Sequence, residues 1–425
     1  MKILVVGSGG REHALVWALQ RGGGRQRRVW CAPGNAGTDA LAESVDVGAT
    51  DLDGLVDLAG RLRPDLTIVG PEAPLAAGLV DRLADRGLTA FGPSRAAARI
   101  EASKAWTKDL LRRHGVRTAR AEVVATEAQA RRALAATGLP AVIKADGLAA
   151  GKGVFVVSRP DEVEAALHAL FGTCSLGGAA DQVLVEEYLV GRELSLLAFS
   201  DGERLALMPP ARDYKRLLDG DSGPNTGGMG GYARPADATP ALLAEIEETI
   251  LRPTVRAMAA EGQPYRGVLY AGLMLTADGP TVLEFNCRFG DPEAQLLLPL
   301  LCSDLAEVCC AVAEGRLDRT AVAWRPSVTC GVVLAAPGYP DRPALNAPIR
   351  GLGLEDDPAA PPPPGLNVFH AGTRRCDSKI VTAGGRVLTV VAAGASLAAA
   401  RTAVYRHLPR ITFEGKQYRT DIGLT

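Results

Sequence analysis

The sequence lacks the features of several protein classes. No apolar run is long enough to span a membrane. The stretch Met1–Leu19 is interrupted by glycines and by Arg11 and Glu12, so it does not have the pattern of a signal peptide. The formal net charge of −1 gives no electrostatic support for nucleic-acid binding. We therefore expect a cytoplasmic protein that binds neither membranes nor nucleic acid.

The cysteines lack the spacing of a metal site. The eight cysteines form no C-x-x-C pair, and Cys309 and Cys310 are adjacent, which suits neither a zinc site nor a disulfide framework. We expect free thiols. Aromatic residues make up only 5% of the chain while glycine occurs 48 times, which favours tight turns and close helix packing. The length of 425 residues predicts about three domains.

A complete dinucleotide fingerprint is also missing. The apolar strand Lys2–Val6 leads through Gly7–Gly10 into a helix, which places backbone N–H groups and a helix dipole where they favour an anion. Glu12, however, stands where the third glycine of G-x-G-x-x-G belongs. The second strand, near Arg28–Cys31, runs into a Gly/Pro turn instead of an acidic residue. Both departures count against NAD, and a structural turn is about as good an interpretation of the glycines.

Successive strand ends in the first third carry Gly/Pro turns. Strands at Asp65–Val69 and Ala90–Phe91 are each followed by such a turn, which predicts a parallel α/β sheet with a crevice at its carboxyl edge. Asn35 and Glu72 fall at this edge and could line the crevice. The commoner role of such residues there is to cap a turn.

The most informative stretch is the strand Thr281–Phe285 and its continuation. Glu284 and Asn286 are two residues apart, so on a strand both oxygens face the same side. A carboxylate inside an apolar run needs a partner, and this pair of hard oxygen ligands suits Mg²⁺. Arg288 lies two residues after Asn286, so on a continuing strand it faces the same side. Its planar guanidinium would offer two parallel N–H groups to a carboxylate or phosphate. The competing interpretation is a strand end with a solvated acidic turn.

A second stretch places lysines beside a glycine-rich loop. Lys144 lies in an apolar strand, where a cation needs an anionic partner. The loop Gly147–Gly153 allows backbone amides to approach phosphate oxygens closely. Walker A spacing is absent, so we predict a different kind of phosphate-binding flap. A hairpin with exposed lysines is the alternative.

Two further segments could complete a nucleotide site. The strand at Val183–Val185 ends in the carboxylates Glu186 and Glu187, and Glu193 opens the next strand, although a charged surface hairpin would look the same. The segment Gly223–Tyr232 is so rich in glycine that we predict a mobile loop over a site rather than a packed element.

In the carboxyl-terminal part, Val328–Ala335 and Arg386–Ala393 are predicted strands and Ser396 a helix cap. We place His370, Thr373 and Arg374 in a loop and give His370 no functional role. We expect this part to form a lid or wall beside the nucleotide site.

With these stretches in hand, the chain resembles the ATP-grasp superfamily and, within it, the phosphoribosylamine–glycine ligase family of purine biosynthesis. The strings that carry the resemblance, in this order, are GNAGT (Gly34–Thr38), VGPEAPL (Val69–Leu75), IKADGLAAGKGV (Ile143–Val154), GPNTGGMG (Gly223–Gly230), EFNCRFGDPE (Glu284–Glu293), VFHAGT (Val368–Thr373) and GGRVL (Gly384–Leu388).

The resemblance implies ATP with Mg²⁺ or Mn²⁺, and glycine and 5-phosphoribosylamine as the joined substrates. It implies Glu284 and Asn286 as metal ligands and Arg288, Asp213 and Lys215 as catalytic residues. The nucleotide-binding residues that it implies are Lys104, Lys144, Gly147, Gly151, Lys152, Gly153, Glu186, Glu187, Tyr188, Leu189 and Glu193. The substrate-binding residues that it implies are Gly10, Arg11, Asn35, Gly37, Glu72, Asn225, Thr226, Pro292 and Glu293.

The chain departs from the family pattern at three places. The strand Gly267–Thr276 carries no carboxylate, so phosphate and water would have to supply the other ligands of a metal ion. Around Asp213 the family pattern is Gln-Asp-His-Lys-Arg, whereas Arg212 and Tyr214 flank Asp213 here. The segment Glu355–Pro364, with four consecutive prolines, is an insertion that we expect to form a surface loop.

The resemblance implies a two-lobed ATP-grasp core of mixed α/β and α+β class. A Rossmann-like parallel α/β domain would precede the core and a small mixed α/β domain would follow it. We expect domains at residues 1–103, 104–320 (mobile lobe 118–190) and 321–425, in a monomer. Three alternatives stay open at this point: another ATP-grasp carboxylate–amine ligase or a bicarbonate-using carboxylase, a nicotinamide-dependent oxidoreductase, and a non-catalytic nucleotide-binding regulator.

Overall fold

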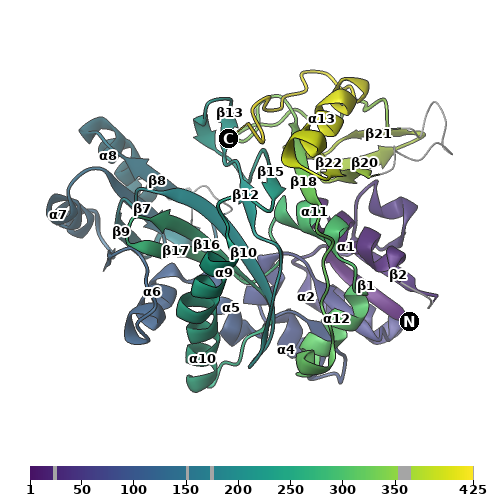
Figure 1. Ribbon diagram of the computed structural model, residues 1–425, viewed down its shortest axis with the longest axis horizontal. Coiled ribbons are helices and arrows are strands. Elements are labelled where there is room, and N and C mark those ends of the chain that lie inside the picture. The colour runs from purple at the N-terminus through teal and green to yellow at the C-terminus, as the bar shows by residue number, and fades with distance from the viewer. Residues whose placement is uncertain (23–25, 150–152, 173–176, 353–364, 425) are drawn as a thin grey trace.

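The computed structural model describes residues 1–425 except 23–25, 150–152, 173–176, 353–364 and 425. In Figure 1 the amino-terminal residues (purple) lie on one side and the blue segment with α7 and α8 on the other. The carboxyl-terminal residues (yellow) lie above the amino-terminal ones. Residues 151 and 152 of the predicted flap and the proline-rich insertion 355–364 lie outside the described residues.

The amino-terminal sheet is five-stranded and parallel, which confirms the predicted Rossmann-like arrangement. Its order is β3-β2-β1-β4-β5. The strands are β1 (Lys2–Gly7), β2 (Arg28–Pro33), β3 (Glu43–Ser44), β4 (Leu66–Val69) and β5 (Ala90–Phe91). The helices that accompany them are α1 (Gly10–Arg21), α2 (Leu52–Leu62), α3 (Glu72–Ala76), α4 (Leu79–Ala84), α5 (Arg95–Ala102) and α6 (Lys104–Arg113).

This sheet is buried on both faces, as its continuous apolar strands predict. Ile3 and Val5 pack with α1 and with α12 (Leu305–Ala313) in one core, and Leu4 and Val6 pack with α2, α4 and α5 in another. Both cores include residues of the central sheet described below. The first domain is therefore fixed firmly against the rest of the chain.

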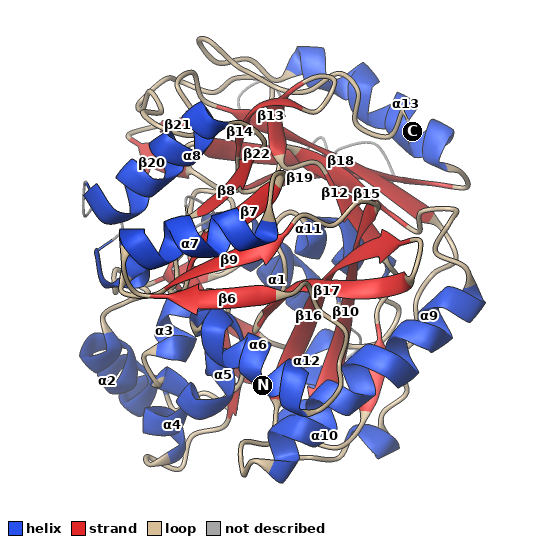
Figure 2. Cartoon of the chain, turned by 90° about the vertical axis from the view of Figure 1, so that its left-hand side faces the viewer, coloured by secondary structure: helices blue, strands red, loops and turns tan. Residues whose placement is uncertain are grey.

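A four-stranded sheet forms a separate lobe with its own small core (Figure 2). Its order is β6-β9-β7-β8, and all pairings are antiparallel. Apolar residues of the helices α7 and α8 pack on the sheet. The elements are β6 (Ala121–Val124), β7 (Ala141–Ala145), β8 (Val154–Val157), β9 (Val183–Glu187), α7 (Glu127–Thr137) and α8 (Pro160–Leu167).

The central sheet has nine strands in the order β17-β16-β10-β12-β15-β18-β22-β19, with β11 paired to β10. The strands are β10 (Arg192–Asp201), β11 (Leu205–Leu207), β12 (Ala211–Asp213), β15 (Gly230–Ala233), β16 (Arg266–Thr276), β17 (Gly279–Asn286), β18 (Val328–Ala335), β19 (Leu366–His370) and β22 (Arg386–Gly394). The remaining elements are α9 (Pro240–Ile246), α10 (Arg252–Ala260), α11 (Glu293–Leu297) and α13 (Leu397–His407), and the hairpins β13 (Arg216–Leu218)–β14 (Ser222–Asn225) and β20 (Thr373–Cys376)–β21 (Lys379–Thr382).

The glycine-rich segment Gly223–Tyr232 corrects one prediction. Its last three residues, Gly230–Tyr232, are not a loop but part of the buried strand β15, which pairs with β12 and β18, and its first three residues belong to β14. A Cβ at Gly230 would overlap the Gly331 carbonyl oxygen, and one at Gly231 would overlap the Arg212 carbonyl oxygen. The glycines therefore serve the close approach of neighbouring backbones rather than mobility.

A smaller correction concerns the loop that we predicted around His370. β19 ends at His370 and β20 begins at Thr373, so only Ala371 and Gly372 connect the two strands. The predicted strands of the carboxyl-terminal part and the Ser396 cap are confirmed, since the Ser396 side chain accepts a hydrogen bond from Ala399 N. Because β18, β22 and β19 belong to the central sheet, the carboxyl-terminal part is continuous with the core.

Candidate active site

A large cavity of about 800 Å³ lies where the four-stranded lobe, the central sheet and the first domain meet. Its wall takes residues from α5, α6, β7, β9, β12, β17 and the β13–β14 hairpin. The junction between the four-stranded lobe and the central sheet adjoins it, because Thr118 Oγ1 donates to Val282 O over 2.8 Å and Val282 N donates to Arg117 O. Strand ends from separate elements thus converge on one space.

Lysine side chains converge at one end of this cavity. Lys144 on β7 is 5% exposed, and its ammonium lies 2.9 Å from a Glu186 carboxylate oxygen and 3.2 Å from Leu283 O. Lys108 on α6 approaches the other Glu186 oxygen at 3.3 Å. Burial lowers the pKa of Lys108 to about 8, although Glu186 opposes that shift. Glu186 is the anionic partner that the burial of Lys144 requires.

Lys104 begins α6 and is held at the same end. The Ser103 side chain caps α6 by accepting from Trp106 N, and Asp146 at the end of β7 accepts from Ala105 N at 2.6 Å. The Lys104 ammonium donates to the carbonyl oxygens of Asp146 and Gly147. Burial lowers its pKa, and the charge of Lys144 lowers it further. Lys104 and Lys108 share a helix face because they are four residues apart.

Glu284 faces these lysines from β17. Its carboxylate makes no hydrogen bond or ion pair within the described residues. Burial raises its pKa, but Lys215, Lys144 and Lys104 act more strongly together, so the net shift is downward and the group is ionised at neutral pH. An ionised, partly exposed carboxylate that faces a cavity without a direct partner is an expected feature of a cation site.

Asn286 completes this oxygen pair, as the two-residue spacing predicts. Its Oδ1 accepts from Arg288 Nη2 at 3.2 Å, which leaves a second lone pair on the oxygen. No group of three or more His, Cys, Asp or Glu side chains suited to a metal occurs among the described residues. Glu284 and Asn286 therefore fit a hard divalent ion only if phosphate and water supply the other ligands.

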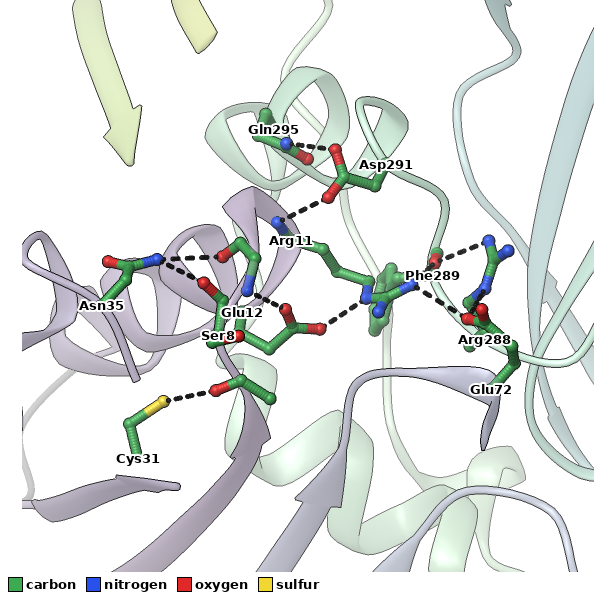
Figure 3. A network of polar contacts seen from close by, with 12 residues as sticks. Ser8, Arg11, Glu12, Cys31, Asn35, Glu72, Arg288, Phe289, Asp291 and Gln295 are labelled. Atoms are coloured by element: carbon green, nitrogen blue, oxygen red, sulfur yellow. Dashed lines mark hydrogen bonds and ion pairs between the residues drawn. The ribbon is translucent and has the colours of Figure 1, made fainter. Parts of the chain in front are cut away.

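Next to Asn286 the cavity meets a closed ion-pair network (Figure 3). Arg288 Nε donates to Glu72 at 3.0 Å, and its Nη2 lies 2.9 Å from Glu101. Arg11 Nε donates to Glu12 at 2.6 Å, and its Nη1 donates to Phe289 O. Burial raises the pKa of Glu72, but Arg288 and Arg11 lower it more, to about 2. Glu72 therefore stays ionised at neutral pH, whereas burial raises the pKa of Glu101 although Arg288 opposes that shift.

Glu12 also explains the broken dinucleotide spacing. Its carboxylate accepts from Gly9 N at 2.6 Å and occupies the space over Gly7 and Gly70, where a Cβ on either glycine would overlap it. The protein's own anion thus fills the turn that would hold a pyrophosphate. This arrangement argues against the nicotinamide alternative.

A third group of charges surrounds Asp213. Lys215 donates to Glu193 at 2.6 Å, and Tyr270 donates to the buried Glu293 at 2.8 Å. Burial raises the pKa of Asp213 to about 7; the nearby carboxylates Glu293 and Glu193 raise it further and Lys215 opposes them. Asp213 is therefore poised to exchange a proton near neutral pH.

Most of the predicted site residues line this one cavity. They are Arg11, Glu72, Lys104, Lys144, Gly153, Glu186, Glu187, Tyr188, Leu189, Glu193, Asp213, Lys215, Asn225, Thr226, Glu284, Asn286, Arg288 and Glu293. Gly151 and Lys152 lie outside the described residues.

Gly147, Gly10, Asn35, Gly37 and Pro292 are not among the lining residues. The Asn35 amide donates to Ser8 O at 2.8 Å and to His370 O at 3.0 Å, so it joins the first domain to the carboxyl-terminal part. Gly37 is packed against the ring of His13 and the Cβ of His370. The predicted contacts of these five residues with the nucleotide or the substrates stay predictions.

Several lining residues were missed by sequence reasoning. Lys108 could have been found from its four-residue spacing to Lys104. Glu101 gave no signal, because its partner Arg288 lies far away in the chain. Arg386 enters from β22, where it donates to Asp291 O at 2.7 Å and to Gly227 O. Arg212, of uncertain role in the sequence, donates to Glu193 O and pairs with Asp237, which is a structural role.

Comparison with known proteins covers the whole chain. Models of the phosphoribosylglycinamide synthetase N domain, ATP-grasp (A) domain and C domain match residues 1–101, 102–294 and 329–425. The chain is 47% identical to a phosphoribosylamine–glycine ligase from Allochromatium vinosum, over 100% of this chain and 98% of that one. It is 48% identical to the ligase of that name from Streptomyces coelicolor, over 100% and 99%.

Solved structures agree. The phosphoribosylamine–glycine ligase from Thermotoga maritima has a TM-score of 0.83 and 35% identity, covering 99% of this chain and 100% of that one. Biotin carboxylase from Campylobacter jejuni shares the fold, with a TM-score of 0.75 at 15% identity, over 100% of this chain and 94% of that one. Among the described residues no helix is both long and apolar enough to cross a bilayer. The chain belongs to the phosphoribosylglycinamide synthetase family, that of the phosphoribosylamine–glycine ligases, and is an ATP-dependent ligase of purine biosynthesis with an ATP-grasp domain.

Proposed function

We propose that this cavity joins the carboxylate of glycine to the amine of 5-phosphoribosylamine at the expense of ATP. A carboxylate acylates an amine only once it carries a good leaving group. The γ-phosphoryl group of ATP would supply one by forming glycyl phosphate and ADP. Attack by the amine then gives glycinamide ribonucleotide and releases phosphate. The observation that carries this proposal is the convergence of Lys104, Lys144 and the unpaired Glu284 on one cavity.

The nucleotide would occupy the lysine end. Lys104 and Lys144 would hold its phosphates. Lys144 is paired with the carboxylate of Glu186, but Lys104 donates only to carbonyl oxygens, so positive charge is left for an anion. Leu283 and its neighbours Val142 and Val156 give that end an apolar wall suited to adenine. The backbone between Glu186 and Leu189 would read the adenine edge, and Glu193 would accept from the ribose. Residues 147–153 would cover the phosphates.

Glu284 and Asn286 would hold Mg²⁺ or Mn²⁺. When bound, the ion would neutralise charge on the ATP phosphates and so favour phosphoryl transfer. The chain's own task is to present these two oxygens at a fixed position beside the lysines. The strand β17 does this because Glu284 and Asn286 share one face.

The other end would bind glycine and phosphoribosylamine. Arg288 carries the fork geometry that suits the glycine carboxylate and its acyl phosphate. Asp213, in its ionised form, would accept the proton that the amine loses on acylation. Lys215 would stabilise the phosphate that leaves. Lining residues that would contact phosphoribosylamine or glycine are Arg11, Glu72, Asn225, Thr226 and Glu293.

Water has to be excluded during the reaction, because an acyl phosphate in open solvent is lost to hydrolysis. The four-stranded lobe, which we propose to be the mobile part (residues 118–190), has its own core and meets the central sheet near Thr118 and Lys144. Closure of this lobe would complete the site. No nucleophilic side chain is required, so the buried Cys287 is a packing residue.

The test is ADP formation with acids and amines offered in turn. Glycine and phosphoribosylamine together should give ADP and phosphate in equal amounts, whereas either alone should give little. ADP release that requires bicarbonate instead of glycine would replace this proposal with a carboxylase. ADP release that needs neither substrate would also contradict it.

The proposal includes a monomeric cytoplasmic enzyme with domains at residues 1–103, 104–320 and 321–425. The ranges of the three family models, 1–101, 102–294 and 329–425, support these boundaries. Size-exclusion chromatography with light scattering tests the oligomeric state. A stable dimer would overturn that part of the proposal alone.

A further inference from the structure

The last residues of the chain reach back to the cavity. Arg419 is the largest fully buried side chain, with 1% exposure, and it lines the cavity together with Asp221. A long charged side chain is rarely buried this far unless its partners are fixed. Arg419 is not needed for any step proposed above, so its burial calls for another explanation.

The partners of Arg419 lie on two parts of the chain. Its Nε and Nη2 donate to the two carboxylate oxygens of Asp421 at 2.7 and 2.6 Å, which is a bidentate pair. Its Nη1 donates to Arg216 O at 3.0 Å and to Asp221 at 3.4 Å. The hydrogen bonds from Arg419 lower the pKa of Asp421 to about 2. The pair is therefore ionised across the pH range of any assay.

The guanidinium also lies 4.8 Å from the centre of the Tyr214 ring. The hydroxyl of Tyr214 accepts from Gly423 N at 3.1 Å. Tyr214 stands between Asp213 and Lys215, and it is one of the positions where this chain departs from the family string. The carboxyl-terminal segment thus contacts both the ring and the hydroxyl of Tyr214, the residue between the two proposed catalytic groups.

The turn of the β13–β14 hairpin is held by the same segment. Gly220 N donates to Asp421 at 2.9 Å, and Thr420 N donates to Asp219 at 2.8 Å. The base of the hairpin contacts the backbone of a proposed catalytic residue, because Thr226 N donates to Lys215 O at 2.7 Å. We call residues 419–423 the carboxyl-terminal latch.

We infer that Arg419 is a positioning residue for ligation, and that the latch fixes the segment 213–226 so that Asp213 and Lys215 face the substrates. This inference rests on the proposed function, since it concerns the same site. Arg419 itself touches neither substrate in this account. It acts through Tyr214 and the Arg216 backbone.

Three variants separate positioning from mere stability. Arg419→Met keeps the apolar stem but removes the fork and the charge. Asp421→Asn keeps the shape and weakens the pair, so it serves if the first variant fails to fold. Lys416→Met is the matched control, because Lys416 also lies over a tyrosine ring, Tyr418, and donates to Leu408 O, yet none of its contacts reaches the segment 213–226.

The first readout is amide hydrogen exchange of the full-length protein, which needs no catalysis. The amides of Tyr214, Thr226 and Met229 donate to Gly230 O, Lys215 O and Tyr214 O. They should exchange at least about tenfold faster in Arg419→Met, and to a smaller degree in Asp421→Asn, and at the parent rate in Lys416→Met. Unchanged exchange in both latch variants would overturn the inference even if the proposed reaction were wrong.

The second readout is steady-state ligation per folded enzyme. Arg419→Met should lower kcat by about 10- to 100-fold, as expected when reacting groups lose their alignment. The dissociation constant for ADP should change by less than about threefold, because its proposed ligands lie on other elements. Lys416→Met should lose thermal stability without losing kcat. Equal kcat in Arg419→Met and Lys416→Met would show a structural role only and refute positioning.

Discussion

The two ends of the cavity differ in their charge balance. The nucleotide-side cluster (Lys104, Lys108, Lys144, Glu186 and Glu284) has three cations and two carboxylates, and Glu284 lacks a direct partner. The acceptor-side cluster (Arg11, Glu12, Glu72, Glu101 and Arg288) has two cations and three carboxylates, each in an ion pair.

This difference indicates what each end is built to do. The surplus of cations on the nucleotide side, of which Lys144 is buried, suits a triphosphate, because a bound anion would balance their charge. In the acceptor-side cluster every charge already has a partner, so Glu72 and Glu101 would hold Arg288 in the orientation in which it meets glycine. Changes at the nucleotide side should therefore weaken nucleotide use, whereas changes at the acceptor side should mainly misplace the acceptor substrates.

The largest effect is expected at Glu284. Glu284→Ala should reduce ADP-forming ligation at least about 10³-fold, because it removes the only carboxylate that we propose as a metal ligand. The melting temperature should change little, since that carboxylate makes no hydrogen bond or ion pair within the described residues. Near-normal turnover in this variant would refute the metal assignment.

Arg288→Lys tests the other end. It keeps the charge but loses the fork that contacts Glu72 and Glu101, so kcat/KM for glycine should fall about 10²-fold. The KM for ATP should change less than that, although the contact of Arg288 with Asn286 is lost as well. Unchanged kinetics with glycine would remove Arg288 from the proposed mechanism. A large rise in the ATP KM would break the division between the two ends.

Asp213 belongs to neither cluster and titrates near neutrality. Its carboxyl is protonated below its pKa of about 7 and becomes ionised above it. Because the ionised form would accept the proton, kcat should rise with pH through a midpoint of about 7. In Asp213→Asn this rise should vanish and kcat above pH 8 should fall about tenfold or more. A profile that keeps its rise in the variant would assign the proton to another group.

The smallest effect is expected at Lys108, which lies behind Glu186. Lys108→Met removes one of the two cationic partners of Glu186, and Lys144 remains as the other. The KM for ATP should rise about fivefold, equivalent to roughly 1 kcal/mol. Lys144→Met is the comparison, and it should have a clearly larger effect because we propose that Lys144 binds the phosphates directly. Equal effects would show that the two lysines act as one unit.

The contrast also shows what sequence could and could not predict. Glu284, Asn286 and Lys144 were predictable because a charged group in an apolar strand needs a partner, and a period of two places both oxygens on one face. Glu101, Arg386 and Arg419 were not, because each acts through contacts with distant parts of the chain. Local pattern holds no information on such pairings.

The prediction of a mobile glycine-rich loop was wrong for a related reason. In Gly223–Tyr232 it was interpreted as mobility, whereas the structure uses Gly230 and Gly231 to let β15 lie between β12 and β18. Sequence shows that a side chain is missing, and only the neighbouring strands show why. The parallel arrangement of the first sheet was predictable, since β1, β2, β4 and β5 each end in a turn rich in glycine or in glycine and proline, whereas β3 was not predicted.

The most direct measurement is a crystal structure with a non-hydrolysable ATP analogue and Mn²⁺, using anomalous scattering to locate the ion. The account predicts a manganese peak between Glu284 and Asn286, with phosphate oxygens bound by Lys104 and Lys144. A triphosphate bound elsewhere, or Lys144 and Asn286 facing different cavities, would contradict it.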